Sequence, residues 1–245
     1  MLEALNLSKR FGGLAAVQDV RLSVPQGSIT ALIGPNGAGK TTLFNLLSGF
    51  LASDSGKVSL EGRDITGLSP HAICRLGMTR TFQIVQPFAP QTVRENIAVG
   101  AHLHHRGRRE AIAAAEDVAR RVGLHAQLDR PASSLTIAGR KRLELARALA
   151  TRPRLLLLDE VLAGLNPQEI NEVLPVVRAI RDGGVTVLMI EHVMQAVMHL
   201  AQHVWVLAQG KLIAEGTPET VTTDPLVIEA YLGPGTAARL KAMAA

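Results

Sequence analysis

The amino-acid sequence predicts an α/β fold that contains a helical insertion. Residues 28–33 are expected to form a strand that runs into a glycine-rich loop and then into a helix with apolar positions at helical spacing. Two apolar runs, 155–158 and 185–190, are typical of buried parallel strands, and a helix-like stretch at 167–180 separates them. Residues 93–149 lie between the glycine-loop region and the first apolar run. Their helical pattern indicates an inserted subdomain.

The remaining elements follow from the same patterns and from turn residues. We expect further strands at 5–7, 20–24, 57–60, 204–207 and 211–215, and helices at 40–50, 95–101, 110–122 and 140–150. Gln209 and Gly210 separate the last two strands and are expected to form a hairpin turn.

Composition sets the broad class of protein. The chain has 245 residues, of which 47% are hydrophobic and 19% charged, so it has enough apolar side chains for a packed core. The net charge of +5 suits nucleic acid, acidic ligands or an anionic membrane surface, but only 3% of residues are aromatic, which argues against stacking platforms for single-stranded nucleic acid. We expect no signal peptide and no membrane span. A single cysteine, Cys74, indicates a reducing compartment.

A phosphate-binding loop is the most specific motif. Gly34-Pro35-Asn36-Gly37-Ala38-Gly39-Lys40-Thr41 matches G-x-x-x-x-G-K-[ST] and stands between a predicted strand and a predicted helix. Its glycines let backbone N–H groups converge on phosphate oxygens, and the helix dipole adds positive potential. The residues expected to contact a nucleoside triphosphate are Asn36, Gly37, Ala38, Gly39, Lys40, Thr41 and Thr42. Lys40 would hold the β- and γ-phosphates, and the Thr41 hydroxyl would ligate Mg²⁺.

Two carboxylates follow the first apolar run. Asp159 and Glu160 come directly after residues 155–158, at the carboxyl end of the predicted strand, where ligands of open α/β sheets bind. Asp159 suits a Mg²⁺ partner, and Glu160 suits a base that orients the attacking water. The pair predicts hydrolysis of the nucleotide.

The order of these motifs resembles that of the ATP-binding subunit of the ABC transporter family, over residues 2–233. Phe11 resembles the aromatic residue that stacks on adenine. Gln83, in Thr81-Phe82-Gln83, resembles the glutamine that contacts Mg²⁺ or the attacking water. His192 resembles the histidine that contacts the γ-phosphate. The resemblance implies ATP and Mg²⁺ as cofactors, with Glu160, His192 and Gln83 acting in catalysis.

The resemblance also implies a single ABC ATPase domain, 1–245, with an internal division. A P-loop NTPase core, in which helices flank a mixed sheet, would comprise residues 1–90 and 151–233 together with an antiparallel β subdomain. The helical subdomain would comprise residues 91–150, and residues 234–245 would form a short tail.

Residues 135–139, Leu-Thr-Ile-Ala-Gly, resemble the family's signature segment, Leu-Ser-Gly-Gly-Gln, with a departure: Ala138 stands at the second glycine and Gly139 at the glutamine. In the family this segment begins a helix and binds the γ-phosphate of the ATP held by the partner subunit. Thr136 preserves the hydroxyl, whereas the Ala138 methyl restricts the approach of phosphate. The basic residues at 140–142 are expected to form a solvated face or a subunit contact.

Softer features indicate the type of transporter. The strings Thr79-Arg80-Thr81-Phe82-Gln83, Ile190-Glu191-His192 and Glu229-Ala230-Tyr231-Leu232-Gly233 resemble those of branched-chain amino acid importer ATPases. This implies a second ATPase subunit, identical or paralogous, and two integral-membrane permeases. It also implies an indirect periplasmic or extracellular solute-binding partner, no nucleic-acid partner, and a peripheral position on the cytoplasmic face of the cell membrane.

Other functions stay open at this point. An export or lipid-transport ATPase would use the same motifs with a different permease, and the solute could be a small amide or acid. A soluble ABC ATPase that acts on DNA or ribosomes usually carries two cassettes or long insertions. A phosphate-loop kinase or GTPase would not need the signature-like segment followed by His192, and the guanine-reading Asn-Lys-x-Asp is absent from the sequence.

Overall fold

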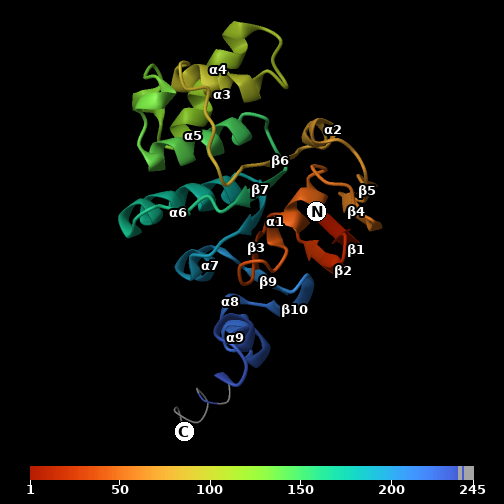
Figure 1. The fold of residues 1–245 in the computed structure, drawn as a ribbon. Helices are drawn as coiled ribbons and strands as arrows, with labels where there is room; N and C mark the ends of the chain where they lie inside the picture. Colours follow the sequence, from red (N-terminus) through yellow and green to blue (C-terminus); the bar gives the residue numbers. More distant parts are fainter. Residues whose placement is uncertain (237–238, 240–245) are drawn as a thin grey trace. The chain divides into compact units, whose positions relative to one another are not determined.

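The computed structural model describes residues 1–236 and 239 (Figure 1). The chain divides into two compact units. The first unit comprises Met1–Pro70 and Leu188–Ala245, and the second comprises His71–Val187. Of the tail expected at 234–245, residues 237–238 and 240–245 lie outside the described residues. No helix in the described part of the chain combines the length and the apolar character needed to cross a membrane.

Two sets of strands build the first unit. Strands β2 (Leu14–Val24), β1 (Leu2–Phe11), β4 (Ser55–Leu60) and β5 (Arg63–Asp64) are antiparallel neighbours in that order. Strand β3 (Ile29–Ile33) is parallel to β9 (His203–Ala208), which is antiparallel to β10 (Lys211–Gly216). The predicted antiparallel sheet and mixed sheet are therefore confirmed. The unit also contains α1 (Lys40–Leu47), α7 (Met194–Leu200), α8 (Pro218–Thr222), α9 (Pro225–Leu232) and most of β8 (Thr186–Ile190).

The β9–β10 turn links the strands of this unit to the phosphate-binding loop. Gln209 has φ +48° and Gly210 has φ +78°, the left-handed pair that a tight two-residue hairpin requires. The Gly210 carbonyl accepts a hydrogen bond from Gln18 N–H in β2 at 2.8 Å, and the Gly210 N–H donates to the Ala38 carbonyl at 2.9 Å. The predicted hairpin is present, and its turn is bonded to both β2 and the loop.

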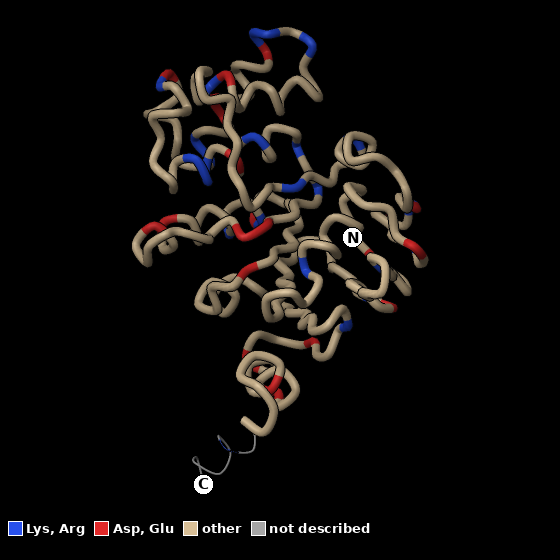
Figure 2. The backbone as a smooth tube through the Cα atoms, viewed as in Figure 1, with Lys and Arg blue, Asp and Glu red and all other residues tan. Residues whose placement is uncertain are grey.

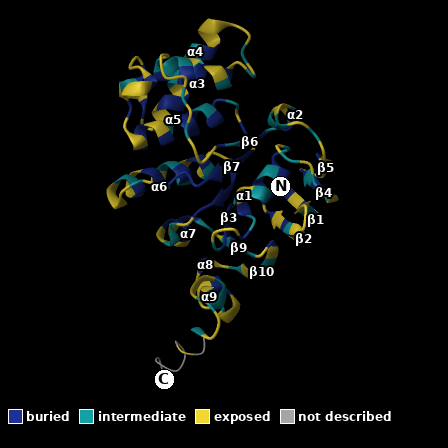
Figure 3. Ribbon diagram, in the orientation of Figure 1, coloured by how far each residue is buried: buried dark blue, intermediate teal, exposed yellow. Residues whose placement is uncertain are grey.

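The core of the first unit is apolar and well covered (Figure 3). All five residues of β3 are buried, and four of them are apolar, as expected of a central strand. Helix α1 buries Leu43, Phe44 and Leu47, which recur at helical spacing, while Thr41 on the same helix is exposed. The loop that precedes α1 therefore joins two elements that are fixed by burial.

The second unit is mainly helical. Helices α3 (Val93–Ala101), α4 (Arg108–Arg121) and α5 (Ile137–Leu149) pack on one another (Figure 1). Two short 3₁₀ helices, His125–Gln127 and Ala132–Ser134, precede α5. Strand β6 (Met78–Arg80) pairs in parallel with β7 (Leu155–Asp159). Helix α2 (Pro70–Arg75) begins at the boundary between the units, and α6 (Pro167–Asp182) follows β7.

Capping residues fix where the helices of this unit begin. Helix α5 begins at Ile137, three residues before the predicted start at 140, because the Thr136 hydroxyl accepts a hydrogen bond from Gly139 N–H at 3.1 Å. Helix α6 begins where it was predicted, at Pro167, because Asn166 and Glu169 form a reciprocal capping box.

A buried carboxylate attaches α5 to the segment that follows β6. Glu144 is 8% exposed, and its Oε1 accepts a hydrogen bond from Phe82 N–H. Its Oε2 is buried and has no hydrogen-bond partner among the described residues. Burial raises the pKa of Glu144, and the Phe82 N–H and the charges of Lys141 and Arg147 oppose this shift.

Replacing Gly56 with alanine is expected to destabilise the first unit. Gly56 has φ +91°, and a Cβ there would overlap the Asn6 carbonyl oxygen of β1. The left-handed conformation and the backbone overlap together should lower the free energy of unfolding in urea by roughly 3 kcal/mol. Gly62 is the matched control, because it has φ +76° and a Cβ would meet nothing within 4 Å. Gly62→Ala should cost about 1 kcal/mol, and equal losses in both variants would contradict the argument.

Glu144→Gln should change how stability depends on pH. Because the pKa of Glu144 is raised in the folded state, the folded protein holds more protons than the unfolded chain, and this carboxyl lowers stability as pH rises through that range. Glutamine keeps an acceptor for Phe82 N–H but stays neutral. The free energy of unfolding of E144Q, relative to wild type, should therefore rise from about pH 4 upward. Glu3→Gln, at an exposed position, is the control. A difference for E144Q that is constant with pH would show that the carboxyl titrates normally.

Candidate nucleotide-binding site

Two glycines let the phosphate-binding loop pass close to neighbouring backbone. Gly34 has φ +153° and Gly39 has φ +104°. A Cβ at Gly34 would overlap the Leu207 carbonyl oxygen in β9, and a Cβ at Gly39 would overlap the Ala16 carbonyl oxygen in β2. No other residue type fits these positions without moving the backbone. The loop is therefore packed between β9 and β2, and its conformation is set before any ligand arrives.

The lysine of the loop is held at the start of α1. Lys40 is 6% exposed, and its Nζ donates to the Gly34 carbonyl at 2.8 Å and to the Pro35 carbonyl at 3.0 Å. A cation at the N-terminal end of a helix adds to the positive potential of the helix dipole. This is the electrostatic environment that phosphate groups require.

The other loop residues leave room for a ligand. Asn36, Gly37 and Thr41 are exposed, Gly39 and Thr42 are half-buried, and Ala38 is buried. Gly37 has φ +77°, and a Cβ built on it would meet nothing within 4 Å. The loop thus presents an open side beside its buried, backbone-packed side.

Phe11 lies in the β1–β2 hairpin. It pairs with Leu14, and the residue is 49% exposed, with Lys9 Nζ 5.8 Å from the ring centroid. Ala16, two positions after Leu14, is the residue whose carbonyl approaches Gly39. The exposed ring is therefore carried by the strand pair that borders the phosphate-binding loop.

His192 directly follows β8, whose five residues are all buried as the apolar run predicts. His192 itself is exposed, whereas Glu191 beside it is 2% exposed. The carboxyl ends of strands are where α/β sheets bind ligands, so the imidazole has the accessibility that its predicted role needs.

In the second unit, the structure brings Gln83 and Glu160 together. Nε2 of Gln83 donates a hydrogen bond to Oε2 of Glu160 at 2.7 Å. Glu160 is 9% exposed and has φ +49°, a conformation that is uncommon outside glycine and costs roughly 1–3 kcal/mol. Such strain persists only where surrounding contacts hold it, and it gathers at functional sites.

Asp159, the last residue of β7, is fixed from two directions. Its backbone N–H donates to the Thr81 hydroxyl at 3.1 Å, and its Oδ2 forms an ion pair with Arg80 Nη2 at 2.6 Å. The residue is 3% exposed. Its other oxygen, Oδ1, has no hydrogen-bond partner in the described part of the chain.

Lys141 joins the segments that carry Gln83 and Glu160. Its Nζ donates to the Gln83 carbonyl at 3.1 Å and to the Glu160 carbonyl at 3.2 Å, and the residue is 6% exposed. Arg142 is also engaged, in an ion pair with Glu172 at 2.5 Å. The expectation that residues 140–142 form a solvated face is therefore wrong for Lys141, because backbone carbonyls solvate its ammonium inside the protein; of the three, Arg140 is exposed. Figure 2 shows basic residues along the segment that contains α5.

The signature-like segment forms the start of α5. Thr136 is exposed and caps the helix, Ala138 is buried in the first turn, and Gly139 is buried beside it. The Thr136 oxygen accepts from Gly139 N–H, so its hydroxyl proton can still be donated to a ligand.

Sequence reasoning missed three residues that hold these segments in place: Arg80, Lys141 and Tyr231. Tyr231, in α9, accepts a hydrogen bond from the Gly34 N–H at the start of the phosphate-binding loop. Burial raises the pKa of Tyr231, and this hydrogen bond opposes the shift. Arg80 and Tyr231 each lay in a string noted only as a mark of transporter type. The buried position of Lys141 could not be predicted from the sequence, because a lysine within a run of basic residues is usually exposed to solvent.

The side chains predicted to ligate Mg²⁺ carry the donor types that this ion prefers. Thr41 offers a hydroxyl, Asp159 a carboxylate oxygen and Gln83 an amide oxygen, all hard donors of the kind that Mg²⁺ prefers. Within residues 1–236 and 239 there is no cluster of three or more His, Cys, Asp or Glu side chains that could hold a metal. A site with one or two carboxylates, completed by phosphate oxygens, is the usual arrangement for Mg²⁺.

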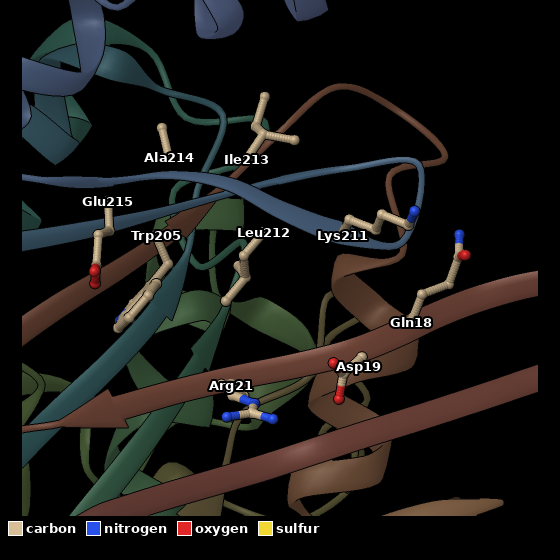
Figure 4. A pocket seen from close by; sticks show the side chains of 9 residues that line it. All are labelled: Gln18, Asp19, Arg21, Trp205, Lys211, Leu212, Ile213, Ala214 and Glu215. Carbon is tan, nitrogen blue, oxygen red and sulfur yellow. The ribbon is translucent and has the colours of Figure 1, made fainter.

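A separate hollow of about 750 Å³ lies on the first unit (Figure 4). It is lined by residues of β2, β9 and β10, namely Gln18, Asp19, Arg21, Trp205, Lys211, Leu212, Ile213, Ala214 and Glu215. None of the residues predicted to bind nucleotide lines it, so it is distinct from the phosphate-binding loop.

Known proteins resemble this chain over nearly its whole length. Residues 17–163 match the model of the ABC transporter family, and residues 211–233 match a model described as branched-chain amino acid ATP-binding cassette transporter. The chain is 43% identical to the high-affinity branched-chain amino acid transport ATP-binding protein BraF of Pseudomonas aeruginosa, across 95% of this chain and 98% of BraF. It is 40% identical to LivG of Escherichia coli, with the same coverage of each chain.

Solved structures give the same result. A nucleotide-free ATP-binding cassette from an ABC transporter superimposes with a TM-score of 0.87 and 33% identity, over 95% of this chain and 99% of the other. A cassette in its ADP conformation gives a TM-score of 0.87 and 34% identity, over 95% and 98%. With its phosphate-binding loop, its carboxylate pair and these matches, the chain belongs to the ABC transporter family of ATP-binding cassettes.

Proposed function

We propose that this chain is the ATP-binding and ATP-hydrolysing subunit that powers an ABC importer, with branched-chain amino acids or related small acids and amides as solutes. The match at residues 211–233 and the names of its relatives support the importer assignment. The observation that carries the hydrolytic part is the hydrogen bond between Gln83 and Glu160, at 2.7 Å. It places an amide beside a strained, nearly buried carboxylate, a combination that can orient and deprotonate water.

The roles of the residues follow from their chemistry. The loop amides of residues 36–42 and the Lys40 ammonium bind the phosphates, and Phe11 stacks on adenine. Thr41, Asp159 and Gln83 would hold Mg²⁺, which supplies charge neutralisation at the phosphates when bound. Glu160 accepts the proton of the attacking water, Gln83 orients that water, and His192 donates a hydrogen bond to the γ-phosphate.

The assembly follows from the signature-like segment. Thr136, Ala138 and Gly139 would bind the γ-phosphate of an ATP held by a second ATPase subunit, so one chain is half of a working pair. ATP binding would close the pair and hydrolysis would reopen it. We propose two permeases and an external solute-binding protein as further partners, and a peripheral position on the cytoplasmic face of the membrane. We also propose that residues 91–150 act as the helical subdomain, with residues 1–90 and 151–233 as the core.

Glu160→Gln should retain ATP binding and lose most turnover. Glutamine keeps the size and the hydrogen bond to Gln83 but cannot accept a proton, so the rate of ATP hydrolysis should fall by at least about a hundredfold. The measurement is phosphate release together with the Kd for ATP. Glu169→Gln is the matched control, since Glu169 belongs to the α6 capping box and glutamine also completes one. Undiminished hydrolysis in E160Q would remove Glu160 from this role.

The proteins that co-purify with the chain test the transport assignment. Affinity purification from detergent-solubilised native membranes, followed by mass spectrometry, should recover two polytopic permeases and a second ATPase. The recovered complex in proteoliposomes, supplied with its solute-binding protein, should then take up labelled leucine in an ATP-dependent manner that E160Q abolishes. Transport that needs no binding protein would favour an export or lipid-transport system. Recovery of soluble or ribosomal partners alone would refute the importer assignment.

A further inference from the structure

A buried ion pair joins the ends of β6 and β7. Arg80 is the last residue of β6 and Asp159 the last residue of β7, and Nη2 of Arg80 lies 2.6 Å from Oδ2 of Asp159. The two side chains are only 6% and 5% exposed. A surface ion pair would be weak and replaceable, whereas a buried pair fixes both partners because neither charge has water as an alternative.

The backbone around this pair is fixed as well. Arg80 is in register with Leu157 of β7, and the next residue, Thr81, donates its backbone N–H to the Leu157 carbonyl at 2.9 Å. The Thr81 hydroxyl accepts the Asp159 N–H at 3.1 Å. The main chain of Asp159 is therefore held by Thr81 and its carboxylate by Arg80, so the carboxylate has one defined orientation.

The two carboxylate oxygens of Asp159 differ in their contacts. Oδ2 is bound to the guanidinium, while Oδ1 has no hydrogen-bond partner among the residues that the structure describes. A carboxylate oxygen accepts a cation as readily as a hydrogen bond, so Oδ1 is the oxygen left for a metal or for a metal-bound water.

Arg80 also contacts the segment that leads to Gln83. Its guanidinium carbon lies 5.5 Å from the centroid of the Phe82 ring, and Phe82 N–H donates to Glu144 of α5. Arg80 therefore both binds Asp159 and packs on the residue before Gln83.

We propose that Arg80 is a positioning residue for the nucleotide's divalent cation: it holds Asp159 so that Oδ1 is directed to Mg²⁺, and it thereby sets the contribution of Mg²⁺ to ATP affinity. This inference rests on the proposed function, since it takes Asp159 as a Mg²⁺ partner. Residues that orient a metal ligand from behind usually affect metal affinity about 10–100-fold.

The test measures how much Mg²⁺ strengthens nucleotide binding. The Kd of a fluorescent, non-hydrolysable ATP analogue is determined in EDTA and in excess Mg²⁺, and the ratio of the two values is compared between variants. Arg80→Lys keeps the charge but not the planar guanidinium that contacts both Asp159 and the Phe82 ring, and Arg80→Gln loses the charge as well. Both variants should reduce the ratio by about tenfold while leaving the Kd in EDTA unchanged. A general packing defect would weaken binding in EDTA as well.

Two controls define the result. Arg142→Lys alters another ion pair of the same unit, with Glu172, and should leave the ratio unchanged. In an Asp159→Asn background, Arg80→Lys should have no further effect on the ratio, because the carboxylate that it positions is gone. An unchanged ratio in folded R80K and R80Q, or an equal effect of R80K with and without Asp159, would overturn the proposal. If the wild-type protein showed no Mg²⁺ dependence at all, the proposed function would fail instead.

A measurement on the wild-type protein keeps the test independent of folding. The side-chain ¹⁵N resonances of Arg80 should shift when Mg²⁺ is added to the complex with the ATP analogue, and should not shift when the analogue is added in EDTA. Arg80 resonances that do not respond to Mg²⁺ would contradict the assignment.

Discussion

The close backbone packing of the phosphate-binding loop is the constraint on which the first unit depends. At Gly34 and Gly39 the loop lies so near the carbonyls of Leu207 and Ala16 that a single Cβ would not fit. Because these contacts are between main-chain atoms, they survive most side-chain changes on either strand. They also fix the loop without a ligand, so binding a triphosphate does not have to order it first. The contact between Gly39 and Ala16 also places the β1–β2 hairpin, which contains Phe11, beside the loop.

The second unit contains several buried charged side chains, which must be balanced inside the protein. Asp159, Glu144, Lys141 and Arg80 are all nearly buried, and each is balanced locally: Asp159 by Arg80, Lys141 by two backbone carbonyls, and Glu144 in part by Phe82 N–H. Every one of these contacts involves residues 80–83 or the turn after β7. The segment that carries Gln83 is therefore attached both to β7 and to α5 by interactions that are costly to break singly. A displacement of this segment would also have to move its attachment points on α5. Because α5 begins with the signature-like segment, these contacts couple the position of Gln83 to the position of that segment.

Local requirements made part of this arrangement predictable from the sequence. The glycine pattern at 34–39, the apolar runs and the Gln209-Gly210 turn each express a rule that acts over a few residues, and the structure follows them. Short elements such as α2, α8 and β6 were not predicted because they contain too few residues for a periodic pattern. The full length of strand β1 was not predicted, because Glu3, Lys9 and Arg10 interrupt the apolar pattern on either side of residues 5–7. The partners of Arg80 and Lys141 could not be predicted, since they come from distant positions and burial turns an ordinary basic residue into a fixed one.

The departure at Ala138 gains a physical explanation from the helix that contains it. Residue 138 lies in the first turn of α5 and is not among the residues with positive φ, so a glycine is not needed there for backbone reasons. Alanine in fact favours a helical position by about 1 kcal/mol over glycine. The first intrahelical bond runs from Arg140 N–H to the Thr136 carbonyl, so the N–H groups of Ile137 and Ala138 precede it. Alanine therefore makes the start of the helix more rigid, with its methyl group buried. The direction of the backbone amide, which a phosphate would recognise, is unchanged.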